Sequence, residues 1–200
     1  MTVQTGRTGW PVVRTPKWMW GGGALLVGGL VLAAIPHHPS ASQRATDLQN
    51  VVSSMTTGIE SCAGGINDSM TALRAIQAGT SHNVSTAVKI ANDGAANCSP
   101  ANSMPMDDLV QYQVPESLAT FNLQSTINDL VTWGFPLAQN VQLDIGKLDA
   151  ATTPAEKAAA TATLHKDQQV LDAQRAKIDN AIKAADTALS ANVAPPNLPS

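Results

Sequence analysis

The sequence is poor in aromatic and charged residues. Of the 200 residues, 4% are aromatic and 14% are charged, whereas about 25% charged residues is typical of globular chains. A β-sandwich core usually draws on β-branched and aromatic residues, but alanine and leucine are prominent among the apolar residues here. Small and aliphatic side chains suit closely packed helices. The composition therefore predicts an all-α fold.

Basic residues are scarce beyond residue 35. All 15 acidic residues but only 9 of the 12 basic ones follow that position, which gives this part of the chain a net charge of −6. Nucleic-acid-binding surfaces need clustered Lys and Arg. The charge distribution therefore argues against a nucleic-acid partner.

Sequence motifs for known chemistries are missing as well. The chain has four histidines and one tyrosine, and neither an HExxH nor a GxSxG motif. Asp107 and Asp108 are adjacent, and adjacent residues on a helix point about 100° apart, so we do not expect them to share a proton. We predict no enzyme activity, no catalytic residue, no cofactor and no metal site.

Two ligand hypotheses remain as alternatives to this prediction. Met104 and Met106 form a thioether pair, with His37-His38 elsewhere in the chain, and soft thioether ligands suit Cu(I). Met70 and His165 would lie at similar levels if the first and last helices are neighbours, and Met/His ligation of haem occurs in helical bundles. Ordinary core and loop packing explains the same residues without any ligand.

One uncharged stretch, Trp18–Ile35, stands out near the N-terminus. Its length is near the short end of the roughly 20 residues that cross a bilayer as a helix. Trp18 and Trp20 lie at one edge, where aromatic rings favour the headgroup region. Three basic residues precede the stretch, so the positive-inside rule predicts a cytoplasmic tail at 1–17, a transmembrane anchor at 18–35 and an extracytoplasmic remainder.

A cleaved secretory signal is the alternative to the anchor. Ser40-Ala41-Ser42 offers small residues for a cut, and Pro36 and Pro39 would end the helix before it. The apolar run is longer than the usual core of about 7–15 residues in a signal peptide. We therefore favour a retained anchor followed by a linker at 36–44, with secretion after cleavage as the alternative.

The part of the chain that follows the linker begins with a predicted helical hairpin. From Ala45 apolar residues recur at steps of three and four, which indicates a long helix that ends at Gly79. Residues 80–81, Thr and Ser, can cap a second helix that reaches Cys98. A short helical turn is expected over 107–113.

The rest of the chain predicts two more long helices. Pro115 suits the first turn of a helix, and Pro136 should kink that helix. The Thr153-Pro154 pair then caps and starts the last helix. Together the segments predict an up-down-up-down bundle over 45–192. A proline-rich tail at 193–200 has no expected core residues.

The two cysteines predict a single disulfide. An exported domain meets an oxidising compartment, in which cysteines pair. Cys62 lies about as far before the Gly79 turn as Cys98 lies after it, so an antiparallel hairpin brings them to the same level. Such a bond should add about 3–4 kcal/mol to stability.

Trp133 and Phe135 form the one aromatic pair of this part of the chain, beside Pro136. A few aromatic anchors often carry most of the energy of an interface, so this pair is a possible partner patch. Core packing at the kink is the alternative, in which case Trp133→Ala should cost about 3–5 kcal/mol.

Four phrases carry a resemblance to other proteins: IESCAGG (59–65), AANCSPAN (95–102), VPESL (114–118) and TWGFP (132–136). With the basic start and the anchor, they resemble uncharacterised single-pass membrane-anchored helical proteins of high-GC Gram-positive bacteria. The resemblance implies the architecture and carries no activity, ligand or site residue.

These observations predict a non-enzymatic, membrane-anchored protein of the cell envelope. We expect a scaffold, adaptor or accessory subunit that contacts the bilayer through Trp18–Ile35 and a protein partner through its helical surface. The alternative is an extracytoplasmic ligand- or metal-binding bundle that acts as a sensor or carrier.

Overall fold

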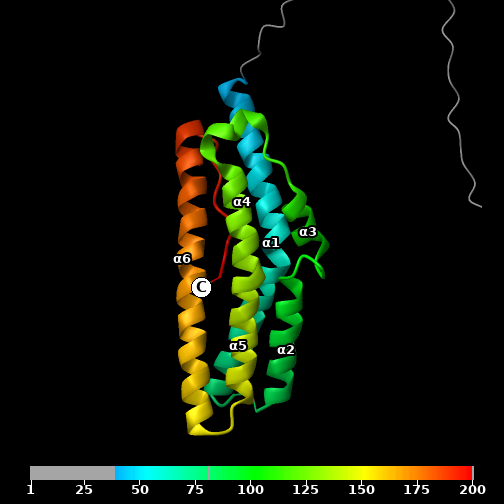
Figure 1. The fold of residues 1–200 in the computed structure, drawn as a ribbon, viewed down its shortest axis with the longest axis vertical. Coiled ribbons are helices and arrows are strands. Elements are labelled where there is room, and N and C mark those ends of the chain that lie inside the picture. Colours follow the sequence, from blue (N-terminus) through cyan, green and yellow to red (C-terminus); the bar gives the residue numbers. More distant parts are fainter. Residues whose placement is uncertain (1–38, 81, 200) are drawn as a thin grey trace, which may run out of the picture. The chain divides into compact units, whose positions relative to one another are not determined.

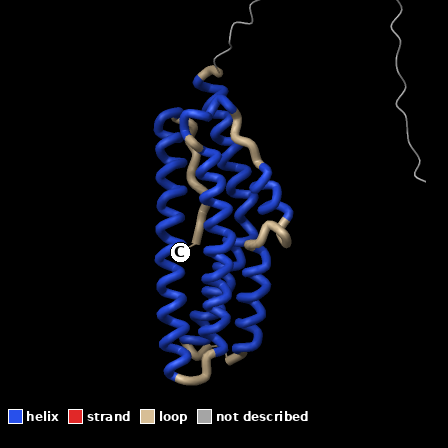
Figure 2. Tube along the Cα trace, viewed as in Figure 1, coloured by secondary structure: helices blue, strands red, loops and turns tan. Residues whose placement is uncertain are grey.

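The computed structural model describes residues 39–80 and 82–199, and these residues are almost entirely helical, without a strand (Figures 1 and 2). The predicted segments 1–17 and 18–35 lie outside them. None of the described helices has both the length and the apolarity to cross a membrane. The elements in chain order are α1 (Ala41–Gln77), α2 (Val84–Asn97), α3 (Met104–Gln111), η1 (Glu116–Phe121), α4 (Leu123–Thr132), η2 (Trp133–Ala138), α5 (Gln139–Ala150) and α6 (Pro154–Leu189).

The long helices alternate in direction. In Figure 1, α1 runs down the bundle, α2 and α3 return, α4 and α5 run down again, and α6 rises along the opposite side. Helix α2 packs between α1 and α5, and α6 packs against both α4 and α5. The predicted all-α bundle is confirmed.

The core consists of the residues that the three-and-four spacing predicts. Leu48, Met55 and Ile66 of α1 are each at most 1% exposed. Helix α6 buries a narrower face than α1. Its buried residues are Leu164, Leu171, Ile178, Ile182 and Ala185. Because most of these are seven residues apart, α6 presents a thin apolar stripe and leaves the rest of its surface in water.

Helix boundaries follow side-chain caps that the pattern of apolar residues does not reveal. Helix α1 begins at Ala41, four residues before the expected start, because the Ser40 side chain accepts the Gln43 N–H. Gly79 ends α1 as predicted, with a left-handed φ of 69°. The cap of α2 is Asn83, whose side chain accepts the Thr86 N–H, and not residues 80–81.

The third long helix is divided more than predicted. Pro115 precedes the short 3₁₀ segment η1, and Asn122 then takes a left-handed φ of 52° before α4 begins. The kink predicted at Pro136 is confirmed: Phe135 leaves the helical region, with φ −135° and ψ 117°, and its peptide bond to Pro136 is cis. Lacking an N–H, proline cannot continue the helical hydrogen bonds.

The C-terminal tail packs on the bundle, contrary to the expectation that it contributes no core residue. Leu198 is 4% exposed and belongs to the core. Asp186 accepts the Val193 N–H at 3.0 Å, and Arg175 donates to the Leu198 carbonyl at 3.3 Å. An extended proline-rich chain rises about 3.1 Å per residue and a helix about 1.5 Å per residue. Residues 193–198 of the tail and residues 175–186 of α6 therefore both span about 16 Å. The tail thus runs antiparallel to α6 in register with it.

Leu198→Ala should release this tail. Removing a buried leucine side chain costs at least about 2 kcal/mol, and the loss here is local because few other tail residues are buried. The amide of Val193 should exchange with solvent roughly 30-fold faster, as measured by hydrogen exchange. The matched control is Asn197→Ala, at an exposed neighbouring position, which should leave the exchange rate unchanged. Equal rates in both variants would contradict the docked tail.

Two glycines allow α1 and α2 to approach closely. A Cβ on Gly65 would lie 2.8 Å from the Gly94 Cα, and a Cβ on Gly94 would lie 2.0 Å from Oε1 of Gln142. Gln142 is fully buried, and its Oε1 lies 3.4 Å from the Ser69 hydroxyl. The close packing therefore occurs at Gly65, whereas a Cβ on the adjacent Gly64 would meet no atom within 4 Å.

Alanine substitutions at these adjacent glycines should have opposite effects. Gly65→Ala forces the backbones of α1 and α2 apart and should destabilise the fold by about 1–3 kcal/mol. Gly64→Ala meets open space, so the higher helix propensity of alanine should stabilise the fold by up to about 1 kcal/mol. Urea denaturation of both variants measures the difference. A Gly65→Ala variant as stable as the Gly64→Ala variant would be incompatible with this crossing.

The start of α6 is held by the predicted Thr153 cap. The Thr153 hydroxyl accepts the Glu156 N–H at 3.2 Å, and the Glu156 carboxylate accepts the N–H groups of Thr153 and Thr152 at 2.9 and 3.0 Å. These bonds, chiefly the one from the Thr153 backbone, lower the pKa of Glu156 from 4.5 to about 2. The reciprocal bonds form a capping box.

The capping box gives stability a defined dependence on pH. Because the folded-state pKa of Glu156 is depressed, its contribution is present above the unfolded pKa and is lost as pH falls from about 4.5 toward about 2. Glu156→Gln keeps a side-chain acceptor but cannot titrate. The stability difference between the native chain and this variant should shrink across that interval in thermal melts. A difference that is constant from neutral pH to the acid limit would contradict the assignment.

Candidate functional site

The predicted disulfide between Cys62 and Cys98 is confirmed. It joins α1 to the end of α2, with the two Cα atoms 4.5 Å apart. Both cysteines are at most 1% exposed. The Gln142 side-chain amide donates to the Cys98 sulfur at 3.0 Å, which links α5 to the same point. The bond therefore closes the hairpin inside the core, beside the Gly65–Gly94 crossing.

Trp133 and Phe135 do not form the exposed pair that a partner patch would need. Trp133 is fully buried, whereas Phe135 is 41% exposed. The non-helical dihedral angles at Phe135 turn its side chain away from the core face that Trp133 occupies. Trp133 is thus a core residue, and only Phe135 is open to contact from outside.

The candidate metal and haem ligands differ in exposure. Met106 is fully buried while Met104 is 81% exposed, and His37-His38 lie outside the described residues. Met70 of α1 meets Gln168 of α6, whose amide donates to its sulfur at 3.9 Å. His165 is exposed. Met104 and Met106 thus face different environments, and the Met70 sulfur accepts a hydrogen bond from the Gln168 amide.

Two buried carboxylates lie on α5. Asp144 forms an ion pair with Lys147 at 2.6 Å. Asp149 is 7% exposed, and neither of its oxygens has a hydrogen-bond partner among the described residues. Burial raises the pKa of Asp149. The ionised form of Asp149 therefore destabilises the folded state. Its contribution to stability falls as pH rises, which is opposite in sign to the contribution of Glu156.

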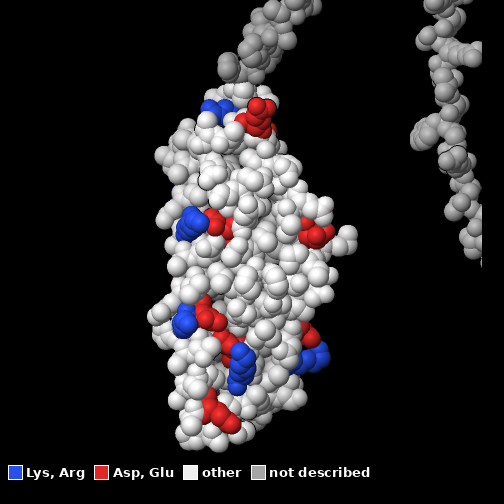
Figure 3. Space-filling model, in the orientation of Figure 1, with Lys and Arg blue, Asp and Glu red and all other residues white. Residues whose placement is uncertain are grey.

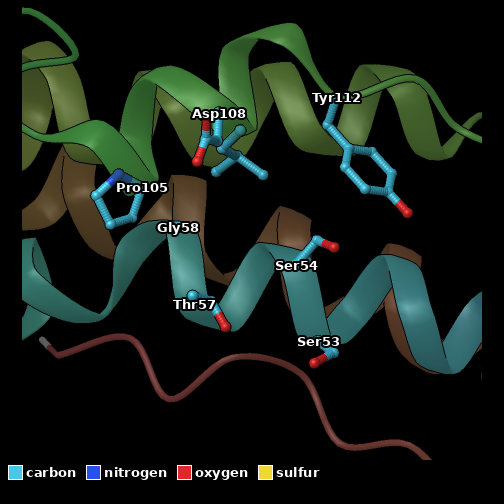
Figure 4. Close-up of a pocket in the computed structure, with 8 residues that line it drawn as sticks. Ser53, Ser54, Thr57, Gly58, Pro105, Asp108 and Tyr112 are labelled. Atoms are coloured by element: carbon cyan, nitrogen blue, oxygen red, sulfur yellow. The ribbon is translucent and has the colours of Figure 1, made fainter.

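One surface hollow of the described residues lies between α1 and α3. It has a volume of about 280 Å³ and is lined by Ser53, Ser54, Thr57, Gly58, Pro105, Asp108, Leu109 and Tyr112. In Figure 4, Asp108 and Tyr112 extend from α3 toward α1, Asp108 near Gly58 and Tyr112 on the side of Ser54. We call this hollow the α1–α3 groove.

Helical spacing builds both walls of the α1–α3 groove. Asp108 and Tyr112 are four residues apart, as are Ser53 and Thr57, so each pair shares one face of its helix. The floor is closed at Gly58, where a Cβ would lie 2.9 Å from the Leu109 Cβ. Buried Met106 and Leu109 fix the rotation of α3. The groove is therefore a rigid feature of two packed helices.

The polar groups of the α1–α3 groove are free to accept an outside partner. Several helical hydroxyls of the bundle donate to the carbonyl four residues earlier, as Thr56 does to Val52 and Thr71 to Asn67. The hydroxyls of Ser53, Ser54 and Thr57 make no such bond to any described residue. The same is true of the Tyr112 hydroxyl and the Asp108 carboxylate.

Sequence reasoning missed this groove because it depends on how α3 docks. Of the residues that line the groove, only Asp108 was considered from the sequence, as one of two adjacent carboxylates. The structure separates the pair: Asp107 accepts a hydrogen bond from Gln111 at 2.8 Å, while Asp108 faces the groove. The position of Gly58 in the seam of α1 was the available signal that another element approaches there.

No group of three or more His, Cys, Asp or Glu side chains within 39–80 and 82–199 is arranged to hold a metal ion. The comparisons with known proteins add no relative: no protein-family model, curated protein or solved structure matches the chain.

Proposed function

We propose that this protein is a non-enzymatic component of the cell envelope, a scaffold, adaptor or accessory subunit. Residues 18–35 anchor it in the membrane with the N-terminus in the cytoplasm, and the bundle acts outside through contacts with other molecules. The observation that carries the proposal is the buried Cys62–Cys98 bond, because stable disulfides are formed in oxidising compartments and are rare in the cytosol.

The arrangement of the bundle supports a role in binding. Its interior is filled by apolar side chains, and the buried Gln142 packs against Gly65 and Gly94 where α1 and α2 cross. His165 and Met104, which could serve as ligands, are exposed. A protein partner would meet the helical surface, where Phe135 is one exposed aromatic.

A second candidate is an extracytoplasmic ligand-binding module. The specific observation in its favour is the α1–α3 groove, whose polar side chains have no partners among the described residues. Binding of a ligand there is compatible with an accessory role in the envelope. It requires neither a metal nor turnover.

Fusion of a reporter enzyme to the C-terminus tests the placement. A reporter that is active only outside the cytoplasm should be active, and the mature chain should still begin before Trp18. A mature start at Gln43 would replace the anchor with secretion after cleavage. Activity only of a reporter that works in the cytoplasm would refute the proposed function.

A further inference from the structure

We propose that the α1–α3 groove binds a neutral saccharide, with the Tyr112 ring against one sugar face and Asp108 and the α1 hydroxyls on its hydroxyl groups. The inference rests on the proposed function, since it assumes that the bundle meets envelope glycans. It gives that function a ligand class and a site.

The donors and acceptors of the groove match those of a sugar. Each serine or threonine hydroxyl can donate one hydrogen bond and accept two, as can each sugar hydroxyl. A carboxylate only accepts, and its two oxygens can take two neighbouring hydroxyls at once. In Figure 4 the Ser54 hydroxyl projects from α1 on the side of Tyr112, and Asp108 extends from α3 toward α1 near Gly58. A ring placed between the two helices can therefore bond to both walls.

Tyr112 supplies the apolar contact that a sugar ring also needs. A tyrosine presents a large apolar face and a polar tip. The Tyr112 ring is half-buried at the end of α3, and its hydroxyl makes no hydrogen bond to a described residue. Stacking of the C–H face of a sugar on this ring would remove apolar area from water on both sides.

Charge selects a neutral ligand over a charged one. The lining contains one carboxylate and no basic residue, so an anionic ligand such as a phosphate would be repelled. A cationic ligand would meet only the single carboxylate of Asp108, with the remaining groups uncharged. The face in Figure 3 shows few and scattered charges. A hydroxyl-rich, uncharged ligand satisfies the largest number of the groove's groups.

The size of the groove indicates how strong the binding should be. Its volume of about 280 Å³ is just below the range of about 300–1,000 Å³ for small-molecule sites. One sugar unit of a longer chain therefore occupies it, and a single unit should bind weakly, with a Kd of about 1 mM or above. Longer glycans would gain affinity by repeated engagement.

The test uses the full chain, ¹⁵N-labelled and reconstituted in lipid nanodiscs. Amide chemical shifts are followed while four probes are added separately: a β-1,4-linked N-acetylglucosamine tetramer, a mannose tetramer, tetralysine and inorganic phosphate. At least one saccharide should shift the amides of Ser54, Thr57, Asp108 and Tyr112, whereas tetralysine and phosphate should not. Shifts at these amides from tetralysine alone, or from no saccharide at up to about 20 mM, would overturn the proposal.

Matched variants assign the contacts. Tyr112→Ala should weaken saccharide binding at least tenfold, and Tyr112→Phe, which keeps the ring, should weaken it by threefold or less. Asp108→Asn should weaken it several-fold, while Asp107→Asn, at the adjacent carboxylate bonded to Gln111, should leave it unchanged. If Tyr112→Ala does not fold, the exposed pair Asp108→Asn and Asp107→Asn decides.

Equal binding by both asparagine variants and the native chain would refute the assignment. The C-terminal reporter separates the two proposals. Absence of saccharide binding with the reporter active outside the cytoplasm refutes the ligand and leaves the proposed function standing. A cytoplasmic C-terminus refutes both.

Discussion

Trp133→Ala should be among the most damaging single substitutions in this bundle, with a loss of about 3–5 kcal/mol in the free energy of unfolding. The side chain is fully buried where η2 joins α4 to α5. Nearby Gly134 is already crowded: a Cβ there would lie 2.6 Å from Met106 and 2.8 Å from Ile59. The surrounding helices therefore have little freedom to close the cavity. Urea denaturation monitored by circular dichroism measures the loss.

Phe135→Ala is the matched control for this prediction. Phe135 lies two residues from Trp133, but it is 41% exposed, so its removal should cost less than about 1 kcal/mol. Similar losses for the two variants would contradict the separation of core and surface at the helix break. Loss of a crosslinked envelope partner in the Phe135→Ala variant alone would identify Phe135 as part of a contact surface.

Removing the disulfide is the second large effect. The double variant Cys62→Ala, Cys98→Ala should lose about 3–4 kcal/mol, because a cross-link between residues 36 apart in sequence restricts the unfolded chain. Helical circular dichroism should persist, since the core on both sides of the bond remains. Chemical denaturation of the native chain with and without reductant should show the share of this loss that is due to the cross-link alone.

The double variant also supplies the control for this experiment, because its stability should not respond to reductant. Equal stability of the native chain in its oxidised and reduced forms would contradict a structural role for the bond. The Gln142 amide loses its sulfur contact at Cys98 in the variant, so a loss somewhat above the entropic value is expected.

Much of the fold could be predicted from the sequence because helical packing repeats itself. Apolar residues recur at steps of three and four along α1, so its buried face from Leu48 to Leu73 could be predicted. The Cys62–Cys98 pairing followed from the same regularity, since a hairpin of two helices leaves few possible registers. The Thr153 cap could be predicted because it depends on the adjacent residues Thr153 and Pro154, whereas the reciprocal bond from Glu156 was not part of that prediction.

The missed features depend on contacts between distant segments. The tail docks through Leu198 on Arg175 of α6, and nothing local in a proline-rich stretch signals such a contact. Trp133 and Phe135 are close in sequence, yet one backbone break at Phe135 sends them to different environments. The α1–α3 groove exists only because α3 approaches Gly58. The loop before α3, which positions that helix, has no periodic pattern of apolar residues from which its path could be predicted.

We propose that the bundle functions outside the cytoplasm with the Cys62–Cys98 bond intact. Counting free thiols in intact cells is a direct test, because the chain has only two cysteines. Cells are quenched in acid, the protein is denatured, and thiols are alkylated with a polyethylene-glycol maleimide before or after reduction. We predict no shift in electrophoretic mobility without reduction and a shift of two adducts after it. Two adducts without prior reduction would show that both cysteines are free thiols in the cell, which would contradict a disulfide-bonded bundle outside the cytoplasm.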